Sequence, residues 1–155
     1  MAIEIERKFL VKQDLWTAVE KGTGKYYVQG YIPTEPGATV RVRVAGDKAF
    51  LTIKGPSKGI AKSEFEYEIP VNDANQLLGE LCAQPIIKYR FEVDYNGKRW
   101  EVDEFLGDNA GLIVAEIELT HEAETFDLPH WIDQEVSDDK RYSNASLARR
   151  PYQSW

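Results

Sequence analysis

The sequence IEIERKFLV, residues 3–11, alternates apolar and charged side chains next to the N-terminus. A period of two is typical of a β-strand, because successive side chains of a strand point to opposite faces of the sheet. Glu4, Glu6 and Lys8 would therefore line one face, and the apolar residues the other. The chemical question is why one row holds two carboxylates and an ammonium group.

The same alternation recurs along the chain, and turn signals separate its segments. Gly46-Asp47 and Asn96-Gly97 each lie between alternating runs, as in β-hairpins. One helix is expected to begin at Asp14 as its N-cap and to stop at Gly22. We expect strands or hairpins at 3–11, 26–32, 39–55, 63–70, 85–105 and 112–120, and helices at 14–22, 73–82 and 144–150.

The strand count favours a closed architecture. About eight antiparallel strands can form a barrel whose interior holds side chains or one small ligand. The sequence contains no repeat of solenoid length and no linker that would divide it. We therefore predict one mainly β (α+β) domain over residues 1–155, an eight-stranded antiparallel barrel with flanking helices and a C-terminal capping helix.

Composition limits the classes of function. The chain is 43% hydrophobic and 29% charged, with a formal charge of -7, which argues against holding nucleic acid through bulk charge. No apolar stretch approaches the roughly 18 residues of a membrane span. Cys82 is the only cysteine, so no internal disulfide can form, and we read it as a packing thiol in a reducing compartment, the cytoplasm.

The charged side chains at every second position of the expected strands indicate the chemistry of the site. On one side of each expected strand, nearly every second residue is ionised. Charges of one sign also cluster within a strand: no acidic residue lies between Arg41 and Arg43, and no basic residue lies between Glu116 and Glu118. Like charges would then lie about 7 Å apart along one strand. One interpretation is a sheet with a solvated charged face. The other is an inward-facing, hydrated site in which acids and bases pair across strands.

The residue types indicate what such a site would bind. Carboxylate pairs suit a hard divalent cation, which takes oxygen ligands. Paired arginines and lysines suit phosphate oxygens, which accept bidentate hydrogen bonds. Acids and bases on one curved face therefore describe a site for a metal-bound polyphosphate.

Residues 4–8 also match the ExExK signature of the CYTH, or triphosphate tunnel metalloenzyme, superfamily. The segments VQGYI, RVRV, LTIKG, EFEYEIP, KYRFEV, WEVDEF, AEIEL and DDKRYSNASLA resemble its short bacterial members in order and spacing. The resemblance covers nearly the whole chain. It implies a tunnel that binds a triphosphate with Mg²⁺ or Mn²⁺ and hydrolyses it.

The resemblance also implies roles for individual residues. The metal-binding carboxylates would be Glu4, Glu6, Asp103, Glu116 and Glu118. The phosphate-binding groups would be Lys8, Arg41, Arg43, Lys54, Lys88 and Arg90. Lys8 and Lys88 would also be catalytic, together with Tyr31 near the reacting phosphoryl group, unless Tyr31 packs at the tunnel mouth. Glu64, Glu66 and Glu68 match an acidic strand of the family.

The C-terminal segment resembles the element that closes one end of the tunnel, where Lys140 or Arg141 would meet either substrate or solvent. His121 and His130 lie outside the alternating pattern, and we interpret them as surface or packing residues.

We therefore predict metal-dependent hydrolysis of inorganic tripolyphosphate to pyrophosphate and phosphate. The alternatives are an organic triphosphate substrate, as in thiamine triphosphatases and class IV adenylyl cyclases, or a polyphosphate-binding module without turnover. Neither nucleic acid nor membrane is an expected partner, and a homodimer through exposed apolar surface is left open.

Overall fold

The computed structural model describes residues 3–155, in which strands dominate. Their bounds are β1 Ile3–Val11, β2 Lys25–Ile32, β3 Thr39–Ala45, β4 Lys48–Lys54, β5 Ala61–Ile69, β6 Ile86–Tyr95, β7 Lys98–Phe105, β8 Ile113–Glu118 and β9 Ile132–Glu135. The predicted segments all contain strands. The short β9 was not predicted from the sequence.

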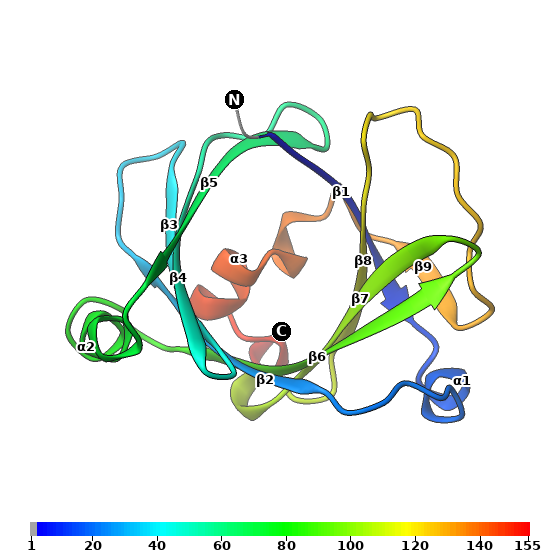
Figure 1. Ribbon diagram of the computed structural model, residues 1–155, viewed down its shortest axis with the longest axis horizontal. Coiled ribbons are helices and arrows are strands. Elements are labelled where there is room, and N and C mark those ends of the chain that lie inside the picture. The colour runs from blue at the N-terminus through cyan, green and yellow to red at the C-terminus, as the bar shows by residue number, and fades with distance from the viewer. Residues whose placement is uncertain (1–2) are drawn as a thin grey trace.

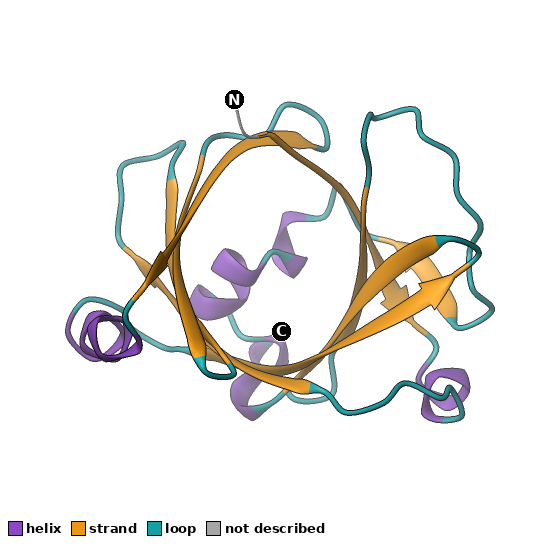
Figure 2. Ribbon diagram, viewed as in Figure 1, coloured by secondary structure: helices purple, strands orange, loops and turns teal. Residues whose placement is uncertain are grey.

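Strands β1 to β8 close into an antiparallel barrel, as predicted (Figures 1 and 2). Their order around the barrel is β5-β4-β3-β2-β6-β7-β8-β1, and β1 returns to pair with β5. Closure depends on β1, which pairs with β5 through residues 3–5 and with β8 through residues 6–10. The strand that carries Glu4, Glu6 and Lys8 therefore joins both ends of the sheet.

Both predicted hairpin turns are present. Asn96 and Gly97 have φ values of 48° and 79°, and two successive positive values are those of a type I′ turn, whose twist matches the flanking strands. Gly46, between β3 and β4, has a φ of 62°. These turns fix the registers that set which side chains face inward.

The helices are short: α1 is Gln13–Thr17, α2 is Val71–Glu80 and α3 is Asn144–Arg149. The prediction of a helix over 14–22 with Asp14 as N-cap was wrong, because Lys12 is the N-cap and the helix ends at Thr17. Lys21 bends back and donates to the carbonyls of Trp16 and Val19. Within residues 3–155, no helix combines the length and the hydropathy needed to cross a membrane.

Two apolar clusters cover the outside of the barrel. Trp16 of α1 packs with Trp100 and Trp131 over the outer face of β1, β7 and β8. Ala74 of α2 packs on Val42 and the outer face of β3 and β4. The apolar side chains of the strands therefore point outward, and the alternating charged side chains point into the barrel.

This cover is incomplete at β5. Ile53 of β4 and Phe65 and Tyr67 of β5 are 39%, 40% and 57% exposed on the outer face. The helices that flank the barrel therefore do not cover its outer face at β5. The homodimer stays the open alternative of the sequence analysis.

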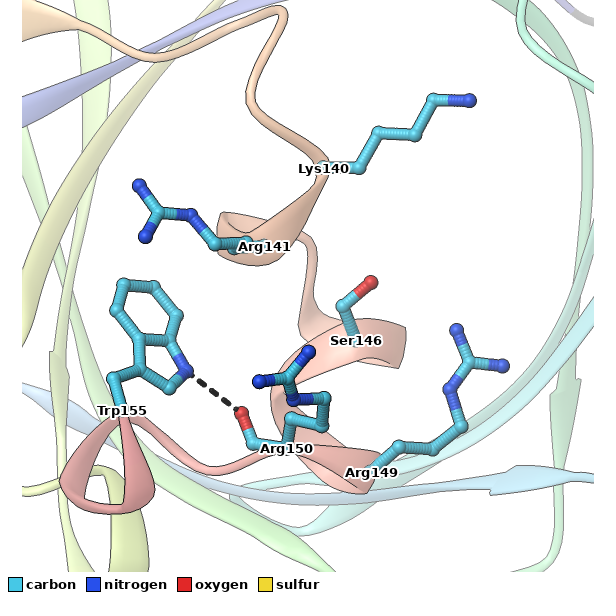
Figure 3. Close-up of a pocket in the computed structure, with 6 residues that line it drawn as sticks. All are labelled: Lys140, Arg141, Ser146, Arg149, Arg150 and Trp155. Carbon is cyan, nitrogen blue, oxygen red and sulfur yellow. Dashed lines mark hydrogen bonds between the residues drawn. The ribbon is translucent and has the colours of Figure 1, made fainter.

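One end of the barrel is closed by the C-terminal elements, as the resemblance implied. Leu147 of α3 is fully buried against Ile86, Phe105, Leu112 and Val114. Three of these lie on β6, β7 and β8, at the ends of their inward-facing rows. The lumen therefore has an apolar floor, and the other face of this cap carries a hollow bordered by Lys140 and Arg141 (Figure 3).

Candidate active site

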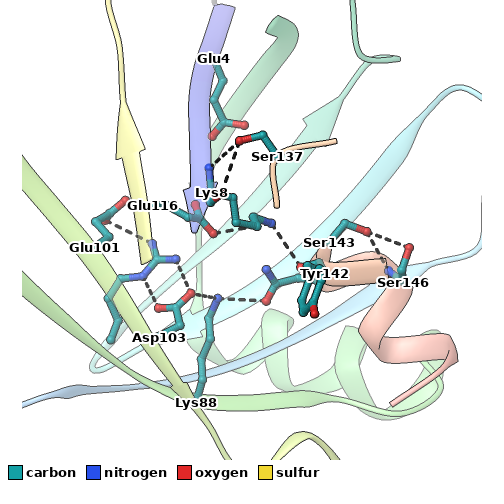
Figure 4. A network of polar contacts seen from close by, with 12 residues as sticks. Glu4, Lys8, Lys88, Glu101, Asp103, Glu116, Ser137, Tyr142, Ser143 and Ser146 are labelled. Carbon is teal, nitrogen blue, oxygen red and sulfur yellow. Dashed lines mark hydrogen bonds and ion pairs between the residues drawn. The ribbon is translucent and has the colours of Figure 1, made fainter. Parts of the chain in front are cut away.

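The charged side chains that alternate along the strands are enclosed by the barrel. Lys88 is completely buried, and Arg41, Glu116 and Arg90 are only 7%, 8% and 9% exposed. A sheet with a solvated charged face would leave these side chains in water, so that interpretation is wrong. Closure of the sheet into a barrel instead brings basic and acidic side chains from all parts of the chain into one lumen (Figure 4).

The deepest polar group of the lumen surrounds Asp103. The Arg90 guanidinium donates to its two oxygens at 2.7 and 2.9 Å, and Lys88 Nζ donates at 2.7 Å. Burial favours the neutral acid, but Arg90 and Lys88 outweigh it and hold the pKa of Asp103 at about 2. Both oxygens thus accept hydrogen bonds from protein, which favours a positioning role over the predicted metal-ligand role of Asp103.

Lys88 connects the lumen wall to the cap. Its ammonium also donates to Asn144 Oδ1 of α3 at 3.0 Å. Burial lowers the pKa of Lys88 to about 7, and repulsion by Arg90 and Arg43 adds to this, although Asp103 opposes it. An anion entering the lumen would stabilise the charged form of this lysine.

A second group of cations lies on β3, next to β2 and β4. Arg43 Nε donates to Gln29 Oε1 at 2.8 Å, while Arg41 Nη2 donates to Thr52 Oγ1 at 3.0 Å. Burial, then repulsion by Arg41 and Arg90, lowers the pKa of Arg43 to about 10. Arg41 Nε is buried and finds no acceptor among residues 3–155. Such an orphaned donor fits a site that receives phosphate oxygens.

Tyr31 lies where the polar lumen meets the apolar floor. Its hydroxyl accepts a hydrogen bond from Gln29 Nε2 at 3.0 Å, and its ring packs on the floor cluster. The packing interpretation of Tyr31 therefore has structural support, and its predicted catalytic role stays a prediction. Tyr27, which the sequence did not single out, lies amid three cations: Arg43, Lys88 and Arg90, at 4.9, 5.9 and 5.1 Å from its ring centroid.

The carboxylates gather on the wall formed by β1 and β8. Burial, together with repulsion by Glu116 and Glu4, raises the pKa of Glu6 to about 8. Glu116 is buried too, yet Lys8 and Arg90 hold its pKa well below the usual range. The Glu6–Glu116 pair therefore keeps one shared proton near neutral pH. Lys8 lies beside it, with Nζ 3.9 Å from Glu116 Oε1.

Glu4 and Glu118 lie further from the cap. Glu4 Oε1 accepts from Lys54 Nζ at 2.9 Å and lies 3.9 Å from Lys62 Nζ. Lys54 Nζ also lies 3.4 Å from Glu64. Burial and repulsion by Glu4 raise the pKa of Glu118. These carboxylates thus share one electrostatic environment with the Glu6–Glu116 pair.

The carboxylate wall fits a divalent cation by its charge. Glu6 and Glu116 disfavour simultaneous ionisation, and a bound cation would relieve their repulsion. In the described part of the chain, residues 3–155, no three acidic, histidine or cysteine side chains already converge on one point. A cation at this wall would therefore be held by one or two carboxylates together with water or phosphate oxygens, which is common for Mg²⁺.

The remaining charged residues divide by position along their strands. Glu66 accepts from Arg41 at 3.2 Å although its side chain is 42% exposed, and Glu68 is exposed as well. Glu92 and Arg99 pair with one another on the β6–β7 hairpin and are more than half exposed. The interpretation of the charged face as an inward-facing site was wrong for this hairpin, since within residues 3–155 only β6 and β7 pair with each other at this point.

Several lumen residues were missed by the sequence interpretation. Gln29 and Thr52 are fully buried. Gln29 lies two residues before Tyr31, and Thr52 lies two residues before Lys54, so the alternation along each strand could have identified them. Lys62 lies two residues before the predicted acidic row. Asn144 carried no sequence signal, because it reaches the lumen from the cap.

The family model for the CYTH domain matches residues 2–152. The chain belongs to the CYTH family. This confirms the resemblance that ExExK and its companion segments indicated.

Two curated CYTH relatives are similar over nearly their whole length. A protein of Acetivibrio thermocellus named inorganic triphosphatase is 49% identical over all of this chain and 99% of its own. A protein of Nitrosomonas europaea with the same name is 32% identical over 94% of this chain and 96% of its own. The crystal structure of the inorganic triphosphatase NE1496 superposes with a TM-score of 0.67, at 32% identity, and covers 96% of this chain and 95% of that one. The closed barrel is therefore the fold of a CYTH triphosphatase.

Proposed function

We propose that this CYTH protein hydrolyses inorganic tripolyphosphate to pyrophosphate and phosphate in a metal-dependent reaction inside the barrel. One observation carries the proposal: the lumen buries Lys88, Arg41 and Arg90 on one side and holds the Glu6–Glu116 pair on the other. The relatives named inorganic triphosphatase support the same substrate.

The cations would bind and orient the triphosphate. Arg41 has an unsatisfied Nε, and Arg43 is held in place by Gln29, so both are oriented before the substrate arrives. Fixed donors in an enclosed site stabilise charge on the reacting oxygens without reorganisation. Lys88 would gain its full charge as phosphate enters, and Lys8, whose Nζ lies 3.9 Å from Glu116 Oε1, would contact a phosphoryl group next to the carboxylates.

The carboxylates would hold the metal. Glu4, Glu6, Glu116 and Glu118 offer the oxygen ligands that Mg²⁺ or Mn²⁺ prefers. Such an ion offsets phosphate charge and lowers the pKa of a bound water, which is the chemistry hydrolysis needs. Asp103 would act indirectly, by orienting Lys88 and Arg90.

The fold favours a small substrate. The apolar floor and α3 close one end of the lumen, so a nucleoside or thiamine group would have to lie towards the opposite end. Linear tripolyphosphate has no such group to place. The organic-triphosphate alternatives therefore differ from the proposal in the product that they form.

The test is phosphate release by purified protein from tripolyphosphate, ATP and thiamine triphosphate, each with Mg²⁺ or Mn²⁺, with products identified by chromatography. We expect pyrophosphate and phosphate from tripolyphosphate at the highest rate. Cyclic AMP as the main product would support a cyclase. The Glu116→Gln variant should lose turnover yet still bind tripolyphosphate, whereas a wild-type protein that binds without any turnover would be a binding module.

We also place this protein in the cytoplasm. Cys82 is a free thiol, which suits a reducing compartment. Sedimentation of the purified chain decides whether it forms the homodimer that the sequence leaves open.

A further inference from the structure

The cap has a second face that the proposed reaction does not use. Asn144 and Leu147 of α3 point towards the lumen, where they contact Lys88 and the apolar floor. Residues three and four apart share one side of a helix, so Ser146 and Arg149 lie together on another side, and Arg150 follows directly after the helix. These three border a cavity of about 380 Å³ together with Lys140, Arg141 and Trp155 (Figure 3).

The charge of this cavity is unusual for the molecule. Four of its six lining residues are cations, although the chain has 26 acidic and 19 basic residues. Arg141 is paired with Asp139 at 2.7 Å. Within residues 3–155, Lys140, Arg149 and Arg150 each lack a carboxylate within the 4.0 Å of a salt bridge.

Three of the four cations around the cavity have no carboxylate partner in the described part of the chain, so their charge is available to a ligand. The cavity volume of about 380 Å³ is that of a sphere about 9 Å across. An anion with several negative charges in this cavity would meet cations from residues 140–141 and from residues 149–150, and guanidinium groups suit phosphate oxygens in particular.

The walls of the cavity are structurally fixed. Trp155 donates its indole N–H to the Arg150 carbonyl at 3.0 Å, and the Arg141 guanidinium lies 4.7 Å from the Trp155 ring centroid. Tyr142 and Tyr152 pack edge-on, each 5.1 Å from the Trp155 ring centroid. The indole stays 41% exposed, but its N–H is already bonded and the Arg141 guanidinium lies near its ring, which favours an inorganic ligand over one whose base would stack on it. Ser146 accepts from Ser143 at 2.8 Å, so its own hydroxyl hydrogen can be donated to a ligand.

We propose that this cavity is a second anion site, outside the lumen, that binds a short inorganic polyphosphate such as tripolyphosphate or pyrophosphate. A short ligand is favoured because the net charge of -7 repels a long polyanion from the rest of the surface. The site goes beyond the proposed function, since it lies across α3 from the groups that would carry out hydrolysis.

The test counts binding sites for tripolyphosphate by titration calorimetry in EDTA, where the metal-dependent reaction cannot proceed. We expect two sites in the wild-type protein and one in the Arg149→Ala/Arg150→Ala variant. The matched control, Lys25→Ala/Lys48→Ala, removes the same charge from exposed positions elsewhere and should keep two. Both arginines are exposed and Trp155 bonds to a main-chain carbonyl, so the substitutions should not disturb folding.

A third variant separates this proposal from the proposed function. Arg41→Ala/Arg43→Ala should remove the lumen site and leave the external one, whatever the protein hydrolyses. Two binding sites in the Arg149→Ala/Arg150→Ala variant would overturn the inference. A single binding site in the wild-type protein that the same variant retains would also overturn it. Tighter binding of ATP than of tripolyphosphate to the Arg41→Ala/Arg43→Ala variant would overturn the inorganic ligand.

Discussion

Replacing Glu6 by Gln should stabilise the metal-free protein at alkaline pH. Glu6 is half-buried beside Glu116 and Glu4, and its pKa rises from 4.5 to about 8. Because the folded state disfavours the charged form, it binds more protons than the unfolded state between these two pH values. Stability therefore falls as pH rises through this window. Glutamine resembles the protonated acid and does not titrate, so the substitution removes the loss.

The structure bounds the size of the effect. The shift to about 8 would correspond to roughly 5 kcal/mol at 1.36 kcal/mol per pKa unit. The pKa of Glu116 shifts in the opposite direction, because Lys8 and Arg90 stabilise its charged form and it bonds to Glu6, so the net destabilisation by the pair is smaller. We expect about 2 kcal/mol at pH 9, a rise in Tm of roughly 4–8 °C for a chain of this size. At pH 5 the two proteins should differ little.

The assay is thermal unfolding of the wild-type and Glu6→Gln proteins in EDTA at pH 5, 7 and 9. Glu92→Gln is the matched control, because Glu92 is more than half exposed on the β6–β7 hairpin. A Glu6→Gln protein with the same pH dependence as the wild type, or with a lower Tm at pH 9, would refute the shared-proton interpretation. The same variant should hydrolyse tripolyphosphate poorly with metal present, which separates stability from function.

Three further outcomes follow from the lumen and its cap. Lys88→Met removes a fully buried cation and should lower kcat/KM for tripolyphosphate by about 10²–10³, the usual cost of losing one preorganised charge contact; a loss below threefold would exclude Lys88 from the reaction. Leu147→Ala opens a cavity in the lumen floor and should cost about 2–5 kcal/mol in denaturant unfolding, and a cost under 1 kcal/mol would mean that the cap is not packed as described. Chelation with EDTA should stop phosphate release, and Mg²⁺ or Mn²⁺ should restore it; release that persists after exhaustive chelation would remove the carboxylate wall from the mechanism.

Much of the site could be predicted because a strand has a strict period of two. Parity alone assigned Lys8, Arg41 and Glu116 to one face, and the turn at Asn96-Gly97 fixed the register of its hairpin. Parity cannot show where a face stops being enclosed. Glu92 and Arg99 have the lumen parity yet lie on a hairpin that projects beyond the neighbouring strands.

The alternation along the strands also could not show which residues far apart in the sequence contact one another. Asp103 looks like a metal ligand in the sequence, and only the positions of Lys88 and Arg90 show that its oxygens accept from both. Asn144 lies 56 residues from Lys88, and Arg149 and Arg150 acquire a shared cavity only because the cap folds across the end of the barrel.

By itself, the sequence determined the strands, their turns, the segregation of charged from apolar side chains and the membership of the CYTH family. The tertiary structure decided which charges are buried, which are paired and which share a proton, and it placed a basic cavity behind the cap. The physical reason is that side-chain alternation is a local property of the backbone, whereas burial and the pKa of a group depend on every chain segment packed around it.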